Sequence, residues 1–161
     1  MGGQNDISTL LARLHAANPS GFAIALHIRF TSPRYLLQSY SKEWIDLYSR
    51  NGLVLQDPTV HWGFANTGTV RWSELRSQDE HGVMTLAAEH GKRFGVCVAI
   101  MEDGSRSIAS FTRPDRELTD DEIAACEADL RNLHRLTQGV ETFSPSVHAT
   151  LKQMSIYLTH G

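Results

Sequence analysis

The sequence has few of the features by which zinc proteins, membrane proteins and nucleic-acid binders are recognised. Its 161 residues include only two cysteines, Cys97 and Cys126, which indicates neither a disulfide framework nor a cluster of thiolate ligands. No apolar run approaches the roughly 18 residues of a membrane span, and the N-terminus lacks the regions of a signal peptide. A net charge of -3 gives no basic surface for nucleic acid. These absences favour a cytoplasmic protein that contacts no membrane and, through this chain, no DNA.

Catalytic patterns are equally scarce. The eight histidines form no H-x-H or H-E-x-x-H pair, and the sequence has neither a P-loop nor a G-x-G-x-x-G motif. Cys97 lies in "GVCVAI", a strand-like run in which a cysteine is usually part of the core. The acidic run "TDDE" suits the first turn of a helix, where the helix dipole favours negative charge. The sequence therefore predicts no enzyme, no metal site and no cofactor.

The chain instead shows the pattern of one globular domain, with 41% hydrophobic and 20% charged residues. Helical spacing or helix-start signals predict helices after Asp6 as N-cap, over 41–50, from Pro58 to about Asn66, over 79–90 and over 119–138. Strand-like runs cover 22–30, 35–40 and the two arms of a hairpin around "EDGS". This order predicts an α+β fold, an α/β/α sandwich with a central antiparallel sheet flanked by helices.

One segment concentrates aromatic residues that can hydrogen-bond. Tyr40, Trp44 and Tyr48 are spaced by four, so they can share one side of a helix. Asp57 follows nine residues after Tyr48, and Trp72 fifteen residues further on. A phenol, an indole N–H and a carboxylate that meet in one cavity would suit a compact ligand with carbonyl and N–H groups. The alternative is that the aromatics are core residues and that Asp57 only caps its own helix.

This spacing resembles the ligand-binding domain of LuxR-type quorum-sensing regulators, which binds acyl-homoserine lactones. The segments "AAEHGKRFGVCVAI" and "DGSRSIASF" resemble the helix and central hairpin of the same family, and the resemblance covers roughly residues 7–140. It implies an autoinducer-binding domain over 1–143. It also implies that 144–161 is a linker and the start of a helix-turn-helix domain otherwise absent from this chain.

The resemblance assigns a role to each polar residue at the head-group end. Trp44 would donate its indole N–H to the lactone carbonyl, Asp57 would accept from the ligand amide, and Tyr40 would donate to the amide carbonyl. Four further residues complete the implied site: Tyr48 and Trp72 as walls of the head-group end, Thr59 near the amide, and Ser110 toward the acyl carbonyl.

The acyl tail would lie among apolar residues between the sheet and the helices. The residues expected there are Leu26, Ile28, Val60, Phe64, Val96 and Val98. Each buried methylene of the tail would contribute about 0.8 kcal/mol. The side chain of Trp62 could point toward this cavity or away from it.

The resemblance also implies partners. A homodimer is expected, with the long helix over 119–138 as the candidate surface, and DNA would be bound only through the missing C-terminal domain. The chain would be a domain of a longer regulator or, alternatively, a naturally short protein. Two other functions stay open: the same fold responding to a different small molecule or to none, and an interaction partner that sequesters a full-length regulator.

Overall fold

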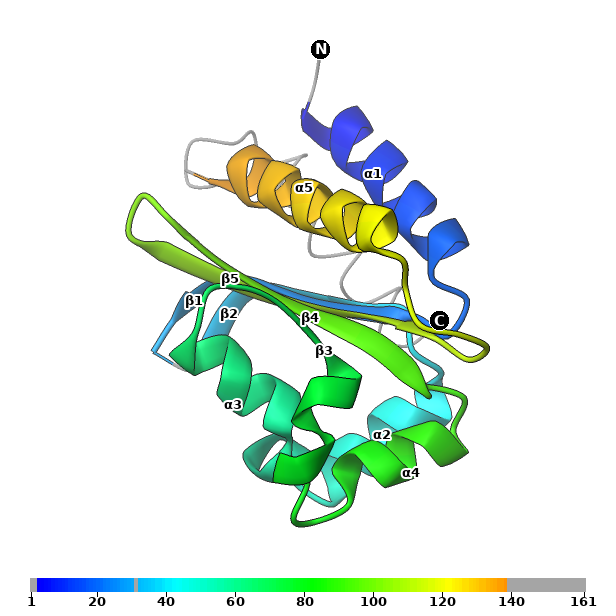
Figure 1. Cartoon of the computed structure of the whole chain (residues 1–161). Coiled ribbons are helices and arrows are strands. Elements are labelled where there is room, and N and C mark those ends of the chain that lie inside the picture. Colours follow the sequence, from blue (N-terminus) through cyan, green and yellow to red (C-terminus); the bar gives the residue numbers. More distant parts are fainter. Residues whose placement is uncertain (1–2, 31, 139–161) are drawn as a thin grey trace.

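A five-stranded antiparallel sheet separates two layers of helices in the computed structural model, which describes residues 3–30 and 32–138 (Figure 1). The strands lie in the order β2-β1-β5-β4-β3. In chain order the elements are α1 (Gly3–Ala17), β1 (Phe22–Arg29), β2 (Ser32–Gln38), α2 (Lys42–Arg50), η1 (Leu53–Gln56), α3 (Pro58–Ala65), β3 (Gly68–Arg71), η2 (Trp72–Gln78), α4 (Val83–Glu89), β4 (Phe94–Glu102), β5 (Ser105–Arg113) and α5 (Asp120–Thr137). The predicted α+β sandwich with a central antiparallel sheet is confirmed.

Helices α1 and α5 cover one face of the sheet and enclose the larger hydrophobic core (Figure 1). Helix α5 begins with a capping box, in which Thr119 Oγ1 accepts from the backbone N–H of Glu122 and the Glu122 carboxylate accepts from that of Thr119. Its buried face carries Cys126, Leu130 and Leu133 against the sheet. This layer is a packed hydrophobic core, and the candidate ligand cavity lies on the opposite face of the sheet.

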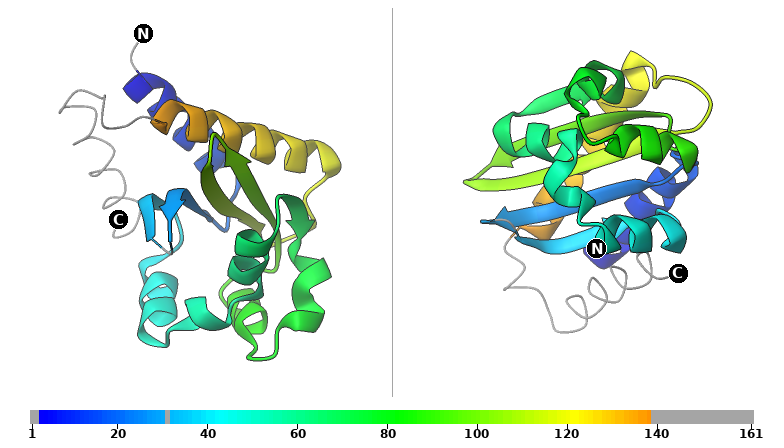
Figure 2. Two further views of the ribbon diagram at one scale, coloured as in Figure 1. Left: turned by 90° about the vertical axis from the view of Figure 1, so that its left-hand side faces the viewer. Right: turned by 90° about the horizontal axis from the view of Figure 1, so that it is seen from below.

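Helices α2, α3 and α4 and the two short 3-10 helices lie on the other face (Figure 2). A second, smaller hydrophobic cluster holds this layer together, and its buried members are Trp44, Leu53, Trp72, Leu75, Val83, Met84 and Ala87. The half-buried side chain of Trp62 packs against this cluster. The candidate ligand cavity lies on this side of the sheet.

A β-bulge in β1 changes which residues face each layer. Between Ala25 and Ile28, β1 advances three residues while its partner β5 advances two, and His27 has a positive φ of 54°. The extra residue interrupts the alternation of side chains. Leu26 and His27 therefore both lie on the α5 side, whereas Ile28 returns to the opposite face.

Several local predictions need correction. Helix α1 begins at Gly3, so the backbone of Asp6 is inside the helix and not at its cap. The helix predicted over 79–90 begins only at Val83, because Gly82 has a positive φ and the Asp79 carboxylate instead accepts from the backbone N–H of Met84. Strand β3 was not predicted, since four residues are too short for a clear alternation. The predicted segment 144–161 lies outside the described residues.

In the part of the chain that the structure describes, no helix combines the length and the apolar composition needed to cross a membrane.

Two histidines in contact join β1 to the C-terminal end of α5. The rings of His27 and His134 lie 4.3 Å apart. Each Nε2 is placed to donate to a backbone carbonyl, that of His134 for His27 and that of Glu102 for His134. Each Nδ1 then accepts from a serine hydroxyl, Ser105 or Ser107. Both neutral rings are therefore fully hydrogen-bonded.

The histidine pair predicts a loss of stability in weak acid. Burial, and for His27 also the neighbouring His134, holds both pKa values below the usual range. The unfolded chain then binds more protons than the folded one below about pH 6.5, so the free energy of unfolding falls as the pH drops through this region. Urea unfolding at pH 7 and pH 5.5 measures the fall, which His27→Gln should reduce. An unchanged pH dependence in that variant would contradict the assignment.

Candidate functional site: a cavity between the sheet and the small helices

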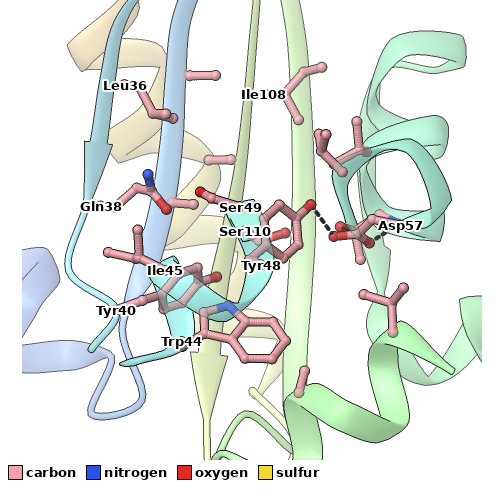
Figure 3. A pocket seen from close by; sticks show the side chains of 18 of the residues that line it. Leu36, Gln38, Tyr40, Trp44, Ile45, Tyr48, Ser49, Asp57, Ile108 and Ser110 are labelled. Carbon is pink, nitrogen blue, oxygen red and sulfur yellow. Dashed lines mark hydrogen bonds between the residues drawn. The ribbon is translucent and has the colours of Figure 1, made fainter. Parts of the chain in front are cut away.

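A cavity of about 410 Å3 lies between the sheet and the α2, α3 and α4 layer (Figure 3). Its lining is mostly apolar, with a few polar groups gathered where α2 meets the start of α3. All seven residues predicted for a ligand site line it: Tyr40, Trp44, Tyr48, Asp57, Thr59, Trp72 and Ser110. Residues far apart in the sequence are thus brought to one cavity, while their roles toward a ligand stay predictions.

The carboxylate of Asp57 is the most connected polar group of the cavity. Oδ1 accepts from the backbone N–H of Thr59 at 2.9 Å and from its hydroxyl at 2.7 Å, and Oδ2 accepts from the phenol of Tyr48 at 2.8 Å. The first of these bonds is the N-cap of α3, and Pro58 supplies the favoured N1 residue. Asp57 is 9% exposed. Each carboxylate oxygen has two acceptor positions, so Oδ2 retains one for a ligand N–H.

Tyr40 and Trp44 present donors to the same space. Among the described residues, neither the Tyr40 hydroxyl nor the Trp44 indole N–H has a hydrogen-bond acceptor. Burial first, and then the negative charge of Asp57, raise the pKa of both Tyr40 and Tyr48, so both phenols stay protonated. The polar end of the cavity thus combines two unused donors with one strong acceptor.

Trp72 and Ser110 form another part of the cavity wall. The indole Nε1 of Trp72 donates to Ser110 Oγ at 3.3 Å, and both side chains are buried. The Trp72 ring lies directly on Gly95 of β4, where a Cβ atom would come within 2.7 Å of the ring. Burial raises the pKa of neighbouring Cys97 to about 12, and this thiol donates to the backbone carbonyl of Thr59. Cys97 is thus a core thiol, as predicted.

The predicted tail residues divide between the two faces of the sheet. Ile28, Val60 and Phe64 line the cavity. The expectation for Leu26, Val96 and Val98 is wrong, because these three side chains are buried in the core under α1 and α5. Leu26 continues the face of Phe22 and Ile24, and the β1 bulge turns only Ile28 to the cavity. A continuous apolar run such as "GVCVAI" gives no indication of which face is which. Trp62 is not among the lining residues.

Sequence reasoning missed three residues near the polar end. Gln38 and Ser49 line the cavity, and Gln38 could have been found because it alternates with Tyr40 along the extended chain. Lys92 is buried beneath the rings of Tyr40 and Trp44. No pattern in the sequence marks it, since a lysine three residues after a helix normally lies in solvent.

Comparison with known proteins places this chain in a family. Residues 21–138 match the family described as "Autoinducer binding domain", and the chain belongs to that family. This identifies it as the ligand-sensing type of domain found in LuxR-type regulators rather than as an enzyme. A similar curated protein is the HTH-type quorum sensing-dependent transcriptional regulator RpaR of Rhodopseudomonas palustris, 28% identical over 89 residues. The match covers 52% of this chain and 37% of RpaR.

Solved structures share the fold at low sequence identity. SdiA in complex with octanoyl-rac-glycerol has a TM-score of 0.66 at 17% identity, covering 88% of this chain and 61% of SdiA. The N-acylhomoserine lactone dependent LuxR family transcription factor CepR2 from Burkholderia cenocepacia has a TM-score of 0.58 at 19% identity, covering 86% of this chain and 84% of CepR2. This chain therefore spans less than two thirds of RpaR and of SdiA.

The connections of Asp57 predict a large effect of its removal on stability. Asp57→Ala deletes the cap of α3 and leaves the Tyr48 hydroxyl unpaired, so the free energy of unfolding should fall by about 2–4 kcal/mol. Asp57→Asn, which keeps an N-cap acceptor, is the matched control and should lose less. Urea unfolding of both variants measures this difference. Equal losses would show that the cap and the Tyr48 contact contribute little.

Proposed function

We propose that this chain senses an N-acyl-homoserine lactone. The observation that supports this most is the placement of two unused donors, on Tyr40 and Trp44, beside the Asp57 carboxylate at one end of an apolar cavity. An acyl-homoserine lactone offers two carbonyls and one amide N–H at one end and a hydrocarbon chain at the other. Donors, acceptor and apolar surface therefore match the ligand group by group.

The head group would be held by three hydrogen bonds. Trp44 Nε1 donates to the lactone carbonyl, Tyr40 donates to the amide carbonyl, and Asp57 accepts from the amide N–H. Tyr48 and Thr59 act through Asp57, since their hydroxyls already donate to its carboxylate. Ser110 accepts from Trp72 and is hydrogen-bonded to the Cys97 thiol, so it supports the wall of the site and is assigned no bond in this set. The bond to an ionised carboxylate is the strongest of the set, at roughly 1.5–3 kcal/mol.

The acyl tail would run from this polar end toward the apolar rim. Ile28, Val60 and Ile108 line the way, and the partly exposed side chains of Leu36 and Phe64 stand where the cavity opens to solvent. Affinity should rise with tail length until the methylenes reach that opening, because each buried methylene contributes about 0.8 kcal/mol.

In the full regulator, ligand binding would be coupled to folding and homodimerisation and thereby to DNA binding. We propose that 1–143 forms the sensing domain and that 144–161 leads into the DNA-binding domain, with the whole protein in the cytoplasm. A ligand that binds only the folded state stabilises it by RT ln(1 + [L]/Kd), about 2.7 kcal/mol at a hundredfold excess over Kd. This linkage lets the ligand control the amount of folded, dimerisation-competent protein.

A second candidate is an amphiphile with a hydroxylated head group, such as a monoacylglycerol. The observation in its favour is that a structure of the same fold, SdiA, holds octanoyl-rac-glycerol. The Asp57 carboxylate would accept from glycerol hydroxyls, but no amide would be required. A domain that sequesters a full-length regulator without any ligand is the remaining alternative.

A thermal-shift series tests the proposal directly. Acyl-homoserine lactones with tails of four to fourteen carbons should raise the melting temperature of the purified chain, by several degrees at the best length. Octanoyl-rac-glycerol serves as the comparison ligand. A larger shift with the glycerol ester would favour the second candidate, and no shift with any of them would move the sequestering role forward.

The role of Asp57 in ligand binding makes a separate prediction. Asp57→Asn keeps the helix cap but loses the charge of the acceptor, so affinity for the best lactone should fall roughly tenfold to a hundredfold. Trp44→Phe, which loses one neutral donor at similar size, should lose less. Isothermal titration calorimetry measures both. An Asp57→Asn variant with unchanged affinity would remove Asp57 from the binding groups.

A further inference from the structure

Lys92 is a buried cation immediately behind the polar end of the cavity. The residue lies in the turn after α4, where its backbone N–H donates to the carbonyl of Ala87. The residue is only 3% exposed. Its Nζ lies 4.7 Å from the ring centre of Trp44 and 5.1 Å from that of Tyr40. Both distances are within the range of a cation–π contact.

The ammonium group lacks an ionic partner among the described residues. Its hydrogen-bond acceptor is the backbone carbonyl of His90 at 3.3 Å, and Glu43 of α2 exerts only a weaker, more distant attraction. Burial lowers the pKa of Lys92 to about 8. A buried charge without a counter-ion destabilises a fold. A methionine would fill a similar space without that cost, so the lysine at this position lowers the stability of the fold.

The two rings that the ammonium contacts belong to Tyr40 and Trp44, the residues with unused donors. A cation over a ring attracts its π electrons and, through the ring, polarises the N–H or O–H bond that the ring carries. The other groups that face this position are the ring of His90, 5.3 Å from that of Trp44, and the carboxylate of Glu43. The backbone at Gly21 supports Tyr40 closely, since a Cβ there would come within 2.7 Å of the tyrosine ring.

We propose that Lys92 is a positioning residue of the binding site, whose ammonium fixes the rings of Tyr40 and Trp44 and strengthens both as donors to ligand carbonyls. The inference deepens the proposed function and rests on it, because it requires a ligand with carbonyl groups at this end. Lys92 itself does not line the cavity and acts through the two aromatic residues. Affinity for such a ligand then depends on the charge of a residue that never touches it.

A ligand-free measurement tests the contact between charge and ring. In 1H-15N spectra, the indole N–H of Trp44, identified by Trp44→Phe, should shift between pH 7 and 9 with a midpoint near the pKa of Lys92, about 8. The indoles of Trp62 and Trp72 are internal controls and should not follow this titration. Lys92→Met should abolish the shift, and His90→Gln should leave its midpoint in place. A flat Trp44 resonance in the unaltered chain would overturn the proposal.

A binding series tests the consequence with N-octanoyl homoserine lactam, which resists hydrolysis at high pH. Its affinity should fall roughly fivefold from pH 7 to 9 in the unaltered chain. Lys92→Met should bind weakly at both pH values, while Lys92→Arg should bind equally at both. N-octanoyl cyclopentylamine, which lacks the ring carbonyl, should show a smaller pH dependence. Equal affinity of Lys92→Met and the unaltered chain at pH 7 would overturn the proposal.

Stability separates this role from simple packing. Without ligand, Lys92→Met should melt at the same or a higher temperature than the unaltered chain at pH 7, because the burial cost of the ammonium is gone. A clearly lower melting temperature would make Lys92 a packing residue and overturn the proposal. If no acyl compound binds any variant, the proposed function fails, and the Trp44 resonance alone decides whether Lys92 polarises the indole.

Discussion

The arrangement of the cavity depends on the carboxylate of Asp57. This carboxylate caps the N-terminus of α3 and accepts hydrogen bonds from the hydroxyl of Thr59 and from the phenol of Tyr48 in α2. Two helices of the small layer are thereby joined at a point that also faces the cavity. A group used to build the site is at the same time the group best suited to recognise an amide. The same side chain therefore links the stability of this layer to ligand recognition.

The two layers of helices differ in the kinds of side chain that they bury. The layer of α1 and α5 is closed by aliphatic side chains and by an α5 that has a complete capping box. The layer of α2, α3 and α4 contains polar groups whose partners are incomplete, notably the Tyr40 hydroxyl and the Trp44 indole, and a buried ammonium. A ligand that supplies carbonyls would complete those hydrogen bonds. The unused donors of Tyr40 and Trp44 thus lie where a ligand can accept from them.

Much of this could be predicted from the sequence, because the signals were local. The Asp57-Pro58 pair, the four-residue spacing of Tyr40, Trp44 and Tyr48 and the Asp103-Gly104 turn each depend on neighbouring residues, and the structure places them as expected. The prediction of the residues around the acyl tail was right for three of the six. Which face a strand residue occupies depends on pairing register, and the extra residue at His27 brought Ile28 to the cavity while Leu26 stayed in the other core. Lys92 could not be foreseen, since its burial arises only from the packing of distant rings.

The β1 bulge also affects how the two layers of helices are connected. Ile28 and His27 are consecutive residues on opposite faces, one lining the cavity and the other bonded to the C-terminal turn of α5 through Thr137 and the carbonyl of His134. The bulge therefore makes a residue of the cavity wall and an anchor of the α5 terminus direct neighbours in the chain. A single peptide unit connects the two layers of helices across the sheet.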